Sequence, residues 1–144
     1  STNKQRTISW RNSSEKGSRM KLVEQARQAR EKASAPYSGY RVGAAVIGDN
    51  GKVYHGANIE AACSSVGICA ERVAISNCVM DGAEPKHIAL IADAEQPITP
   101  CGTCRQFMLE FAPLKVTMAN LGGKTKTTTA NKLLPLKFER RKRI

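Results

Sequence analysis

Two short cysteine-containing segments hold the residue types best suited to chemistry in this chain. Cys101 and Cys104 form a Cys-x-x-Cys pair, and Cys69 lies upstream in a Cys-Ala-Glu sequence that ends at Glu71. A Cys-x-x-Cys pair at a helix start can direct both sulfurs to one point, where free backbone N–H groups stabilise thiolate charge. Alone, such a pair fits a redox dithiol as well as a metal site. Cys69 favours the metal, because three thiolates bind Zn²⁺ and leave a fourth position for water.

The number of cysteines bears on the environment in which the protein works. The chain has five cysteines, an odd number, and we find no secretory signal in it. We therefore expect reduced thiols and a cytoplasmic location rather than a disulfide framework. A structural zinc site with Cys63 as fourth ligand is an alternative, although its separation from Cys69 is longer than such ligand pairs usually have. Otherwise Cys63 and Cys78 are expected to be buried free thiols.

The spacing of Cys69 and Glu71 predicts where a substrate would lie. Residues two apart in a helix do not share a face, so both side chains can meet one small molecule only off the end of the helix. The positive pole of the helix faces the thiolates at that end. We therefore predict a site at which the N-terminal ends of two helices converge.

Hydrophobic periodicity predicts the elements that must position these residues. The first expected elements are a helix from Arg19 to before Pro36 and strands over 41–47 and 52–59, which a tight turn at 48–51 joins. They are followed by a helix over 69–80, a strand over 87–92 and a helix over 101–111. Strands over 114–119 and 124–129 and a last turn or helix before Pro135 complete the expected order. Hairpin and crossover connections both occur in this order. The pattern predicts an α/β fold with one mixed sheet and helices packed on its faces.

The charge distribution separates the ends of the chain from its body. The formal net charge is +11, most of it in residues 1–21 and 137–144, while the residues between are nearly neutral. Clustered Lys and Arg bind phosphates by releasing counterions. The basic tails therefore leave a nucleic-acid partner open, whereas the nearly neutral body argues against such a partner. No apolar run is long enough to span a membrane. We divide the chain into a flexible basic tail (1–18), a catalytic domain (19–138) and a second basic tail (139–144).

Five stretches of the chain together resemble the cytidine deaminase family, in its short homotetrameric branch. They are Pro36–Ala45, Gly56–Glu60, Cys69–Arg72, Pro100–Gln106 and Leu133–Pro135. The resemblance implies a three-layer αβα fold with a mixed, roughly five-stranded sheet, a homotetramer and one Zn²⁺ per subunit. It also implies hydrolytic deamination of cytidine and 2′-deoxycytidine to uridine and 2′-deoxyuridine, with release of ammonia, as in pyrimidine salvage.

The resemblance assigns roles to the residues of the two cysteine segments. Cys69, Cys101 and Cys104 would bind zinc, and Glu71 would be the catalytic proton shuttle. The charge of three thiolates exceeds that of the metal and would weaken its effect on a bound water. We expect Arg72 and the amides at both helix starts to offset this excess by hydrogen bonding to the sulfurs.

The resemblance also assigns substrate-binding residues. Asn58 and Glu60 would hold a ribose hydroxyl, and as alternate residues of a strand they would project to the same face. The backbone amide of Ala70 would bind the pyrimidine carbonyl. Tyr40 could line the pocket, and Phe138 could enter the pocket of a neighbouring subunit.

Two segments depart from the family pattern and leave alternatives open. Where the family commonly has Asn-Ala-x-Tyr after the ribose-binding glutamate, residues 61–64 read Ala-Ala-Cys-Ser, so a tyrosine near the site is absent. One alternative is therefore a deaminase of a modified aminopyrimidine nucleoside such as blasticidin S. The basic sequence after Phe138 replaces the usual small or acidic tail. It leaves open a cytosine deaminase that acts on a polynucleotide, and puts the role of Phe138 in question.

Overall fold

The computed structural model describes residues 6–7 and 15–143, which form one sheet and the helices that cover it. The helices are α1 (Glu15–Arg30), α2 (Ala70–Met80), α3 (Gly102–Leu109) and α4 (Ala130–Leu133), with a 3₁₀ turn at Ser64–Val66. The strands are β1 (Arg6–Thr7), β2 (Val42–Gly48), β3 (Lys52–Ala57), β4 (Pro85–Ala92), β5 (Lys115–Asn120) and β6 (Thr125–Thr129).

The sheet is mixed, as the sequence predicts, and its strand order is β1-β3-β2-β4-β5-β6. β2 pairs antiparallel with β3 and with β4, β4 pairs parallel with β5, and β5 pairs antiparallel with β6. The parallel pair requires a crossover connection, and the chain makes it through α3. Five strands were expected, and β1 extends the sheet by a two-residue edge strand.

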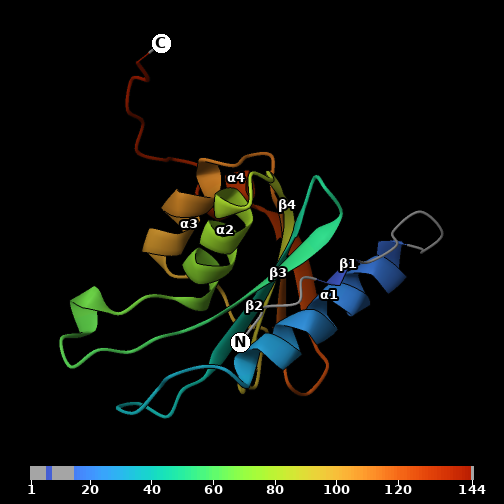
Figure 1. Ribbon diagram of the computed structural model, residues 1–144, viewed down its shortest axis with the longest axis vertical. Coiled ribbons are helices and arrows are strands. Elements are labelled where there is room, and N and C mark those ends of the chain that lie inside the picture. Colours follow the sequence, from blue (N-terminus) through green and yellow to red (C-terminus); the bar gives the residue numbers. More distant parts are fainter. Residues whose placement is uncertain (1–5, 8–14, 144) are drawn as a thin grey trace.

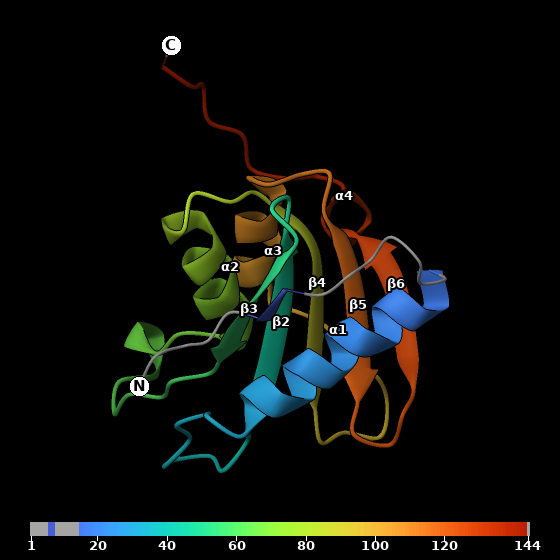
Figure 2. The ribbon, with the colours of Figure 1, turned by 45° about the vertical axis from the view of Figure 1, so that its right-hand side comes forward.

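Helices cover both faces of the sheet, so the predicted three-layer αβα arrangement is confirmed (Figures 1 and 2). Alternate residues of β2 serve the two layers, as the period of a strand requires. Ala45 and Ile47 belong to the buried cluster beneath α1, whereas Ala44 and Val46 belong to the cluster beneath α2 and α3.

The N-terminal segment differs from its prediction in two places. α1 begins at Glu15 rather than at Arg19 and ends at Arg30, well before Pro36. Apolar spacing begins only at Leu22, where the helix is buried against the sheet, so the preceding turn gives no periodic signal. Arg6–Thr7, within the segment predicted to be a flexible tail, pairs with β3. The rest of that segment before Glu15 lies outside the described residues, and the division into tails and domain stays a prediction.

Beyond α4 the chain continues as an extended segment that runs away from the sheet (Figure 2). The side chains of residues 136–143 are exposed. Within residues 15–143, none of the helices has both the length and the apolar character to cross a bilayer.

Candidate active site

The N-terminal ends of α2 and α3 meet beside the sheet, which confirms the predicted convergence of two helix starts. Cys69 is the N-cap of α2 and Cys101 is the N-cap of α3, both with extended backbone angles. Cys104 lies in the first turn of α3 and is buried. Neither N-cap side chain makes a capping hydrogen bond to its helix, and the two sulfurs approach each other at one place.

The three cysteines form a cluster that fits a zinc ion. Their sulfur atoms lie within 4.8 Å of one another, and the Sγ atoms of Cys69 and Cys101 are 3.8 Å apart. All three thiols are free, and thiolate is a ligand that zinc prefers in proteins. Cys63 does not belong to the cluster, so the four-cysteine structural site has no support. The expectation that Cys63 is buried was wrong, because its thiol is exposed and bonds to the hydroxyl of Ser65 at 3.1 Å.

The thiols of the cluster need positive charge nearby to be stable as thiolates. Burial raises the pKa of Cys104 and of Cys69, and the neighbouring charge of Glu71 raises both further. Burial acts to raise the pKa of Cys101 as well, but interactions with Cys104 and Cys69 together outweigh it and lower that pKa. The neighbouring Arg72 guanidinium lowers the pKa of Cys69 and so favours its thiolate form, although the buried Nε of Arg72 has no hydrogen-bond partner. That Arg72 offsets the thiolate charge stays a prediction. Besides this cation, a bound metal ion would stabilise the thiolates.

Glu71 lies in the first turn of α2 and is only 4% exposed. Burial raises the pKa of its carboxyl, while the Cys104 thiol and the charge of Arg72 act in the opposite direction. A carboxyl with a raised pKa can hold and release a proton nearer neutral pH than an exposed one. This position suits proton transfer to a molecule lying off the helix start.

A cavity of about 800 Å³ opens directly in front of the cluster. Cys69, Cys101 and Glu71 line one part of it. The other predicted residues of the pocket line it as well, namely Tyr40, Asn58, Glu60, Ala70 and Arg72. The structure therefore brings these residues together around one space, although their individual roles stay predictions.

Glu60 fastens the loop that forms one wall of this cavity. Its Oε1 accepts hydrogen bonds from the backbone N–H groups of Tyr37 and Ser38, each at 3.0 Å. The Ser38 hydroxyl donates to the other carboxylate oxygen. These donors lower the pKa of Glu60, with the Ser38 hydroxyl contributing most. The carboxylate thus fixes the 35–41 loop in addition to any contact with a substrate.

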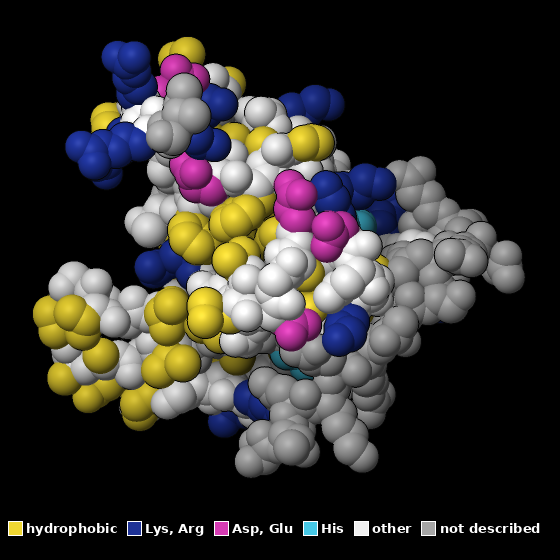
Figure 3. Space-filling model, turned by 45° about the horizontal axis from the view of Figure 1, so that its top comes forward, with side chains coloured by type: hydrophobic (Ala, Val, Ile, Leu, Met, Phe, Trp, Pro, Cys, Tyr) yellow, Lys and Arg dark blue, Asp and Glu magenta, His cyan; other side chains and the backbone are white. Residues whose placement is uncertain are grey.

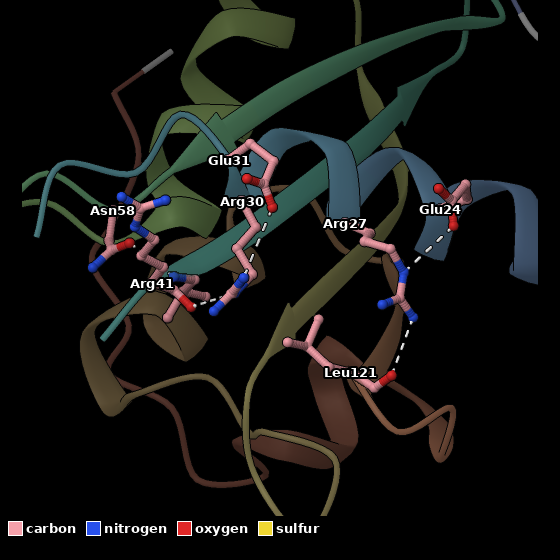
Figure 4. A network of polar contacts seen from close by, with 8 residues as sticks. Glu24, Arg27, Arg30, Glu31, Arg41, Asn58 and Leu121 are labelled. Carbon is pink, nitrogen blue, oxygen red and sulfur yellow. Dashed lines mark hydrogen bonds and ion pairs between the residues drawn. The ribbon is translucent and has the colours of Figure 1, made fainter. Parts of the chain in front are cut away.

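Asn58 fastens the same loop at its other end. Its Oδ1 accepts from the N–H of Val42 and its Nδ2 donates to the carbonyl of Tyr40, both at 2.8 Å. Figure 4 shows Asn58 near Arg41, whose carbonyl accepts a hydrogen bond of 3.2 Å from Arg30 of α1. β3 ends before Asn58, but Ile59 forms bridges to two neighbouring segments, which keeps 58–60 extended. Sequence reasoning missed this anchoring role.

Phe138 lies outside the cavity. It is 75% exposed and lines a separate groove on α2 and α3, which shares Ile68, Arg72 and Thr103 with the cavity. The side chain of Gln106 holds the backbone of Phe138 with two hydrogen bonds. Entry of Phe138 into a neighbouring subunit's pocket stays a prediction.

Several cavity residues were not predicted from the sequence. Ile98, Thr99 and Thr103 line it around the Cys-x-x-Cys segment, and Ser64 and Ser65 line its outer rim. Thr103 lies inside the Cys-x-x-Cys motif and Ser64 lies in the 61–64 segment, but neither was assigned a role. Proximity in sequence to Cys101 is the one signal that could have indicated the first three.

Comparisons with known proteins agree with this geometry. Residues 16–120 match the family described as the cytidine and deoxycytidylate deaminase zinc-binding region. The cytidine deaminase of Sporosarcina psychrophila is 44% identical over 123 residues, which cover 83% of this chain and 90% of that protein. A crystal structure of the cytidine deaminase from Burkholderia pseudomallei has a TM-score of 0.80 at 43% identity, covering 83% of this chain and 98% of that one. The blasticidin-S deaminase of Bacillus cereus is more distant, with 31% identity over 112 residues that cover 70% of this chain and 79% of that protein. By sequence and by fold, the chain belongs to the cytidine deaminase family.

Proposed function

We propose that the protein hydrolyses the bond between C4 and the amino group of cytidine and 2′-deoxycytidine, forming the uridine nucleoside and ammonia. One observation carries the proposal: the buried carboxyl of Glu71 and three converging thiols lie at a cavity that Asn58 and Glu60 also line. Family membership makes the cytosine ring the expected reacting group. Each part of the cavity then has a chemical task.

Cys69, Cys101 and Cys104 would hold one Zn²⁺ per subunit. Zinc, when bound, lowers the pKa of water and supplies hydroxide near neutral pH. The position of the Arg72 guanidinium beside Cys69 and Cys104 supports the expectation that it offsets part of the thiolate charge. A less negative ligand set leaves the metal a stronger Lewis acid.

Glu71 would move the protons of the reaction. It accepts a proton from the attacking water, delivers it to N3 of the ring and then assists the departure of ammonia from C4. Burial supports this assignment, since the raised pKa lets the carboxyl hold the proton between the two steps. The surrounding protein also excludes bulk water from the carboxyl.

The remaining pocket residues would bind and orient the nucleoside. Ala70 is the first residue of α2, and the first N–H groups of a helix have no partner within it, so its amide can donate to the pyrimidine carbonyl. Asn58 and Glu60 would hold a ribose hydroxyl. Tyr40 is partly exposed and would contact the nucleoside at the edge of the pocket.

We further propose a homotetramer in the cytoplasm. Figure 3 shows hydrophobic side chains gathered on the loop that projects at the left, and Ile59 and Val66 of the 58–68 loop are 50% and 70% exposed. Exposed apolar groups of this kind are typical of surfaces that another subunit covers. Phe138 would be covered in the same assembly.

A direct assay tests the function. Protein purified with stoichiometric zinc should convert cytidine, seen as loss of its absorbance band, and Glu71→Ala should abolish conversion while it keeps the metal. If Glu71→Ala stays active, the proposed mechanism is wrong.

A second candidate substrate is blasticidin S, which is favoured by the small residues that line the cavity and by the similarity to a blasticidin-S deaminase. Steady-state kinetics on cytidine, 2′-deoxycytidine, blasticidin S and a cytosine-containing oligonucleotide would rank them.

A further inference from the structure

Arg105 follows the last metal-ligating cysteine and joins two distant parts of the chain. Its Nε donates to the carbonyl of Pro100 at 2.8 Å, and its Nη1 donates to the carbonyl of Leu133 at 3.1 Å. Pro100 directly precedes Cys101, the N-cap of α3. Leu133 is the last residue of α4. One guanidinium therefore spans the loop that carries a zinc ligand and the end of a helix near the C-terminus.

α4 is itself firmly placed and can serve as a fixed support. The N–H of Ala130 donates to the carbonyl of Leu114 at 2.9 Å, and Ala130 is fully buried. The Thr129 hydroxyl caps α4 by accepting from the N–H of Lys132. Leu133 also packs on the buried cluster beneath α2 and α3. The carbonyl that Arg105 binds thus belongs to a helix tied to Leu114, the residue before β5, and to the core.

A second residue of α3, Gln106, holds the segment that follows α4. Gln106 donates from Nε2 to the carbonyl of Phe138 at 3.0 Å and accepts at Oε1 from the Phe138 N–H at 3.2 Å. The chain is therefore fastened to α3 on both sides of Pro135. With both ends of this stretch held, the position of the Leu133 carbonyl does not depend on Arg105 alone.

We infer that Arg105 is a positioning residue for the metal centre: by fixing the carbonyl of Pro100 to the end of α4, it sets the position of the Cys101 sulfur. The inference rests on the proposed zinc site. Cys101 needs such support because it is an N-cap, outside the hydrogen-bonded part of α3, and its side chain is exposed. Cys104 lies within the helix and is buried.

The chemistry of the guanidinium explains why an arginine is suited to this place. Its planar fork can donate from two nitrogens to two separate acceptors, whereas an ammonium concentrates its donors on one atom. The last carbonyls of a helix also lack partners within it and attract positive charge. Arg105→Lys keeps the charge but is too compact to hold both carbonyls. It therefore tests the bridge rather than the charge.

The test compares Arg105→Lys with the wild type and with a matched control, Arg27→Lys. Arg27 donates at 3.4 Å to the carbonyl of Leu121, on the α1 face of the sheet (Figure 4). We expect Arg105→Lys to bind zinc about 10- to 100-fold more weakly in competition with a chelator, as is usual when support of a ligand is lost. The visible absorption bands of the Co²⁺-substituted protein, which report the arrangement of the sulfur ligands, should change as well. Arg27→Lys should match the wild type in both measurements.

The possible results separate a positioning role of Arg105 from a purely structural one and from failure of the proposed zinc site. Equal zinc affinity and equal Co²⁺ spectra for Arg105→Lys and wild type would overturn the inference. Thermal unfolding of the metal-free proteins separates positioning from general stability, because a positioning role lowers Tm more with zinc bound than without it. If Arg105→Lys lowers Tm equally in both forms, or does not fold, Arg105 is only structural and the inference fails. If the wild-type protein itself binds no zinc, the proposed function fails instead.

Discussion

Gly56 controls how closely α2 approaches the sheet, and its replacement tests whether that approach sets the active site. Gly56 lies in β3, and a Cβ atom there would be 2.3 Å from the backbone nitrogen of Ala74 and 2.4 Å from the carbonyl oxygen of Ala70. Ordinary contact begins at 3.4 Å. Gly56→Ala must therefore displace the first turns of α2 by about 1 Å.

The expected losses follow from this displacement. Overpacking of this kind costs about 1–3 kcal/mol of unfolding free energy, which for a domain of this size lowers Tm by roughly 3–10 °C. Cys69, Ala70 and Glu71 move with the start of α2, whereas Cys101 and Cys104, at the start of α3, stay. A misplacement of about 1 Å between catalytic groups costs about 100-fold in rate, so kcat should fall by that factor. Zinc content, kcat on cytidine and thermal unfolding by circular dichroism give the three measurements.

Gly43→Ala is the matched control on the opposite face. A Cβ at Gly43 would lie 2.1 Å from the carbonyl oxygen of Ala26 and 2.6 Å from the nitrogen of Arg30, both in α1. It should lower Tm at least as much as Gly56→Ala, yet keep its zinc and a kcat close to wild type. The reasoning is refuted if Gly56→Ala retains full activity, or if Gly43→Ala loses activity by the same factor.

Three further substitutions probe separate contacts. Tyr54 donates to Asp81 and accepts from Asn50, so Tyr54→Phe should lose about 1–2 kcal/mol in urea unfolding at unchanged kcat, and an unchanged midpoint would contradict this. Burial and the bond to Asp81 raise the pKa of Tyr54 above its ordinary value of 10.0. Its neutral form therefore stabilises the wild type below about pH 10, and this contribution is lost as the pH rises further; Tyr54→Phe should show a weaker decline. Arg72→Ala should move the pH profile of kcat/KM to higher pH, because the thiolate charge is no longer offset; an identical profile would show that Arg72 does not tune the site. Glu60→Gln should lower kcat/KM for cytidine about tenfold or more, since the amide keeps one oxygen for the two backbone donors of the 35–41 loop but loses the negative charge and the oxygen that accepts from the Ser38 hydroxyl; wild-type kinetics would exclude that role.

The metal cluster was predictable because its determinants are local in the sequence. Cys69 and Cys101 each stand where an apolar helical pattern begins, and the short spacing to Cys104 places two sulfurs at one helix start. The two helices begin one residue after their predicted starts, because Cys69 and Cys101 are caps with extended angles that periodicity does not register. The cysteine spacing and the predicted helix starts therefore pointed to the same place in the chain, and each supported the other.

The supports of the site were not predictable, because their partners are distant and carry no pattern. Arg105 reads in the sequence as an ordinary helical arginine, yet it joins Pro100 to Leu133. The strand β1 has two polar residues and no alternation that could reveal it. Such contacts depend on how elements pack, so only the folded chain shows them.

The hydrogen bonds of Asn58 and Glu60 leave room for both of the roles considered for them. Asn58 uses one of its two amide hydrogens on the 35–41 loop and one of its two oxygen lone pairs on Val42. Glu60 receives two of its loop bonds on Oε1 and one on Oε2, so Oε2 keeps a free acceptor site. A hydroxyl that donates to Glu60 and accepts from Asn58 can therefore bind without breaking any bond to the loop. Since the same two side chains hold the loop, binding of the sugar at this place would also strengthen the wall of the cavity, and a loop that is misplaced would weaken sugar binding in return.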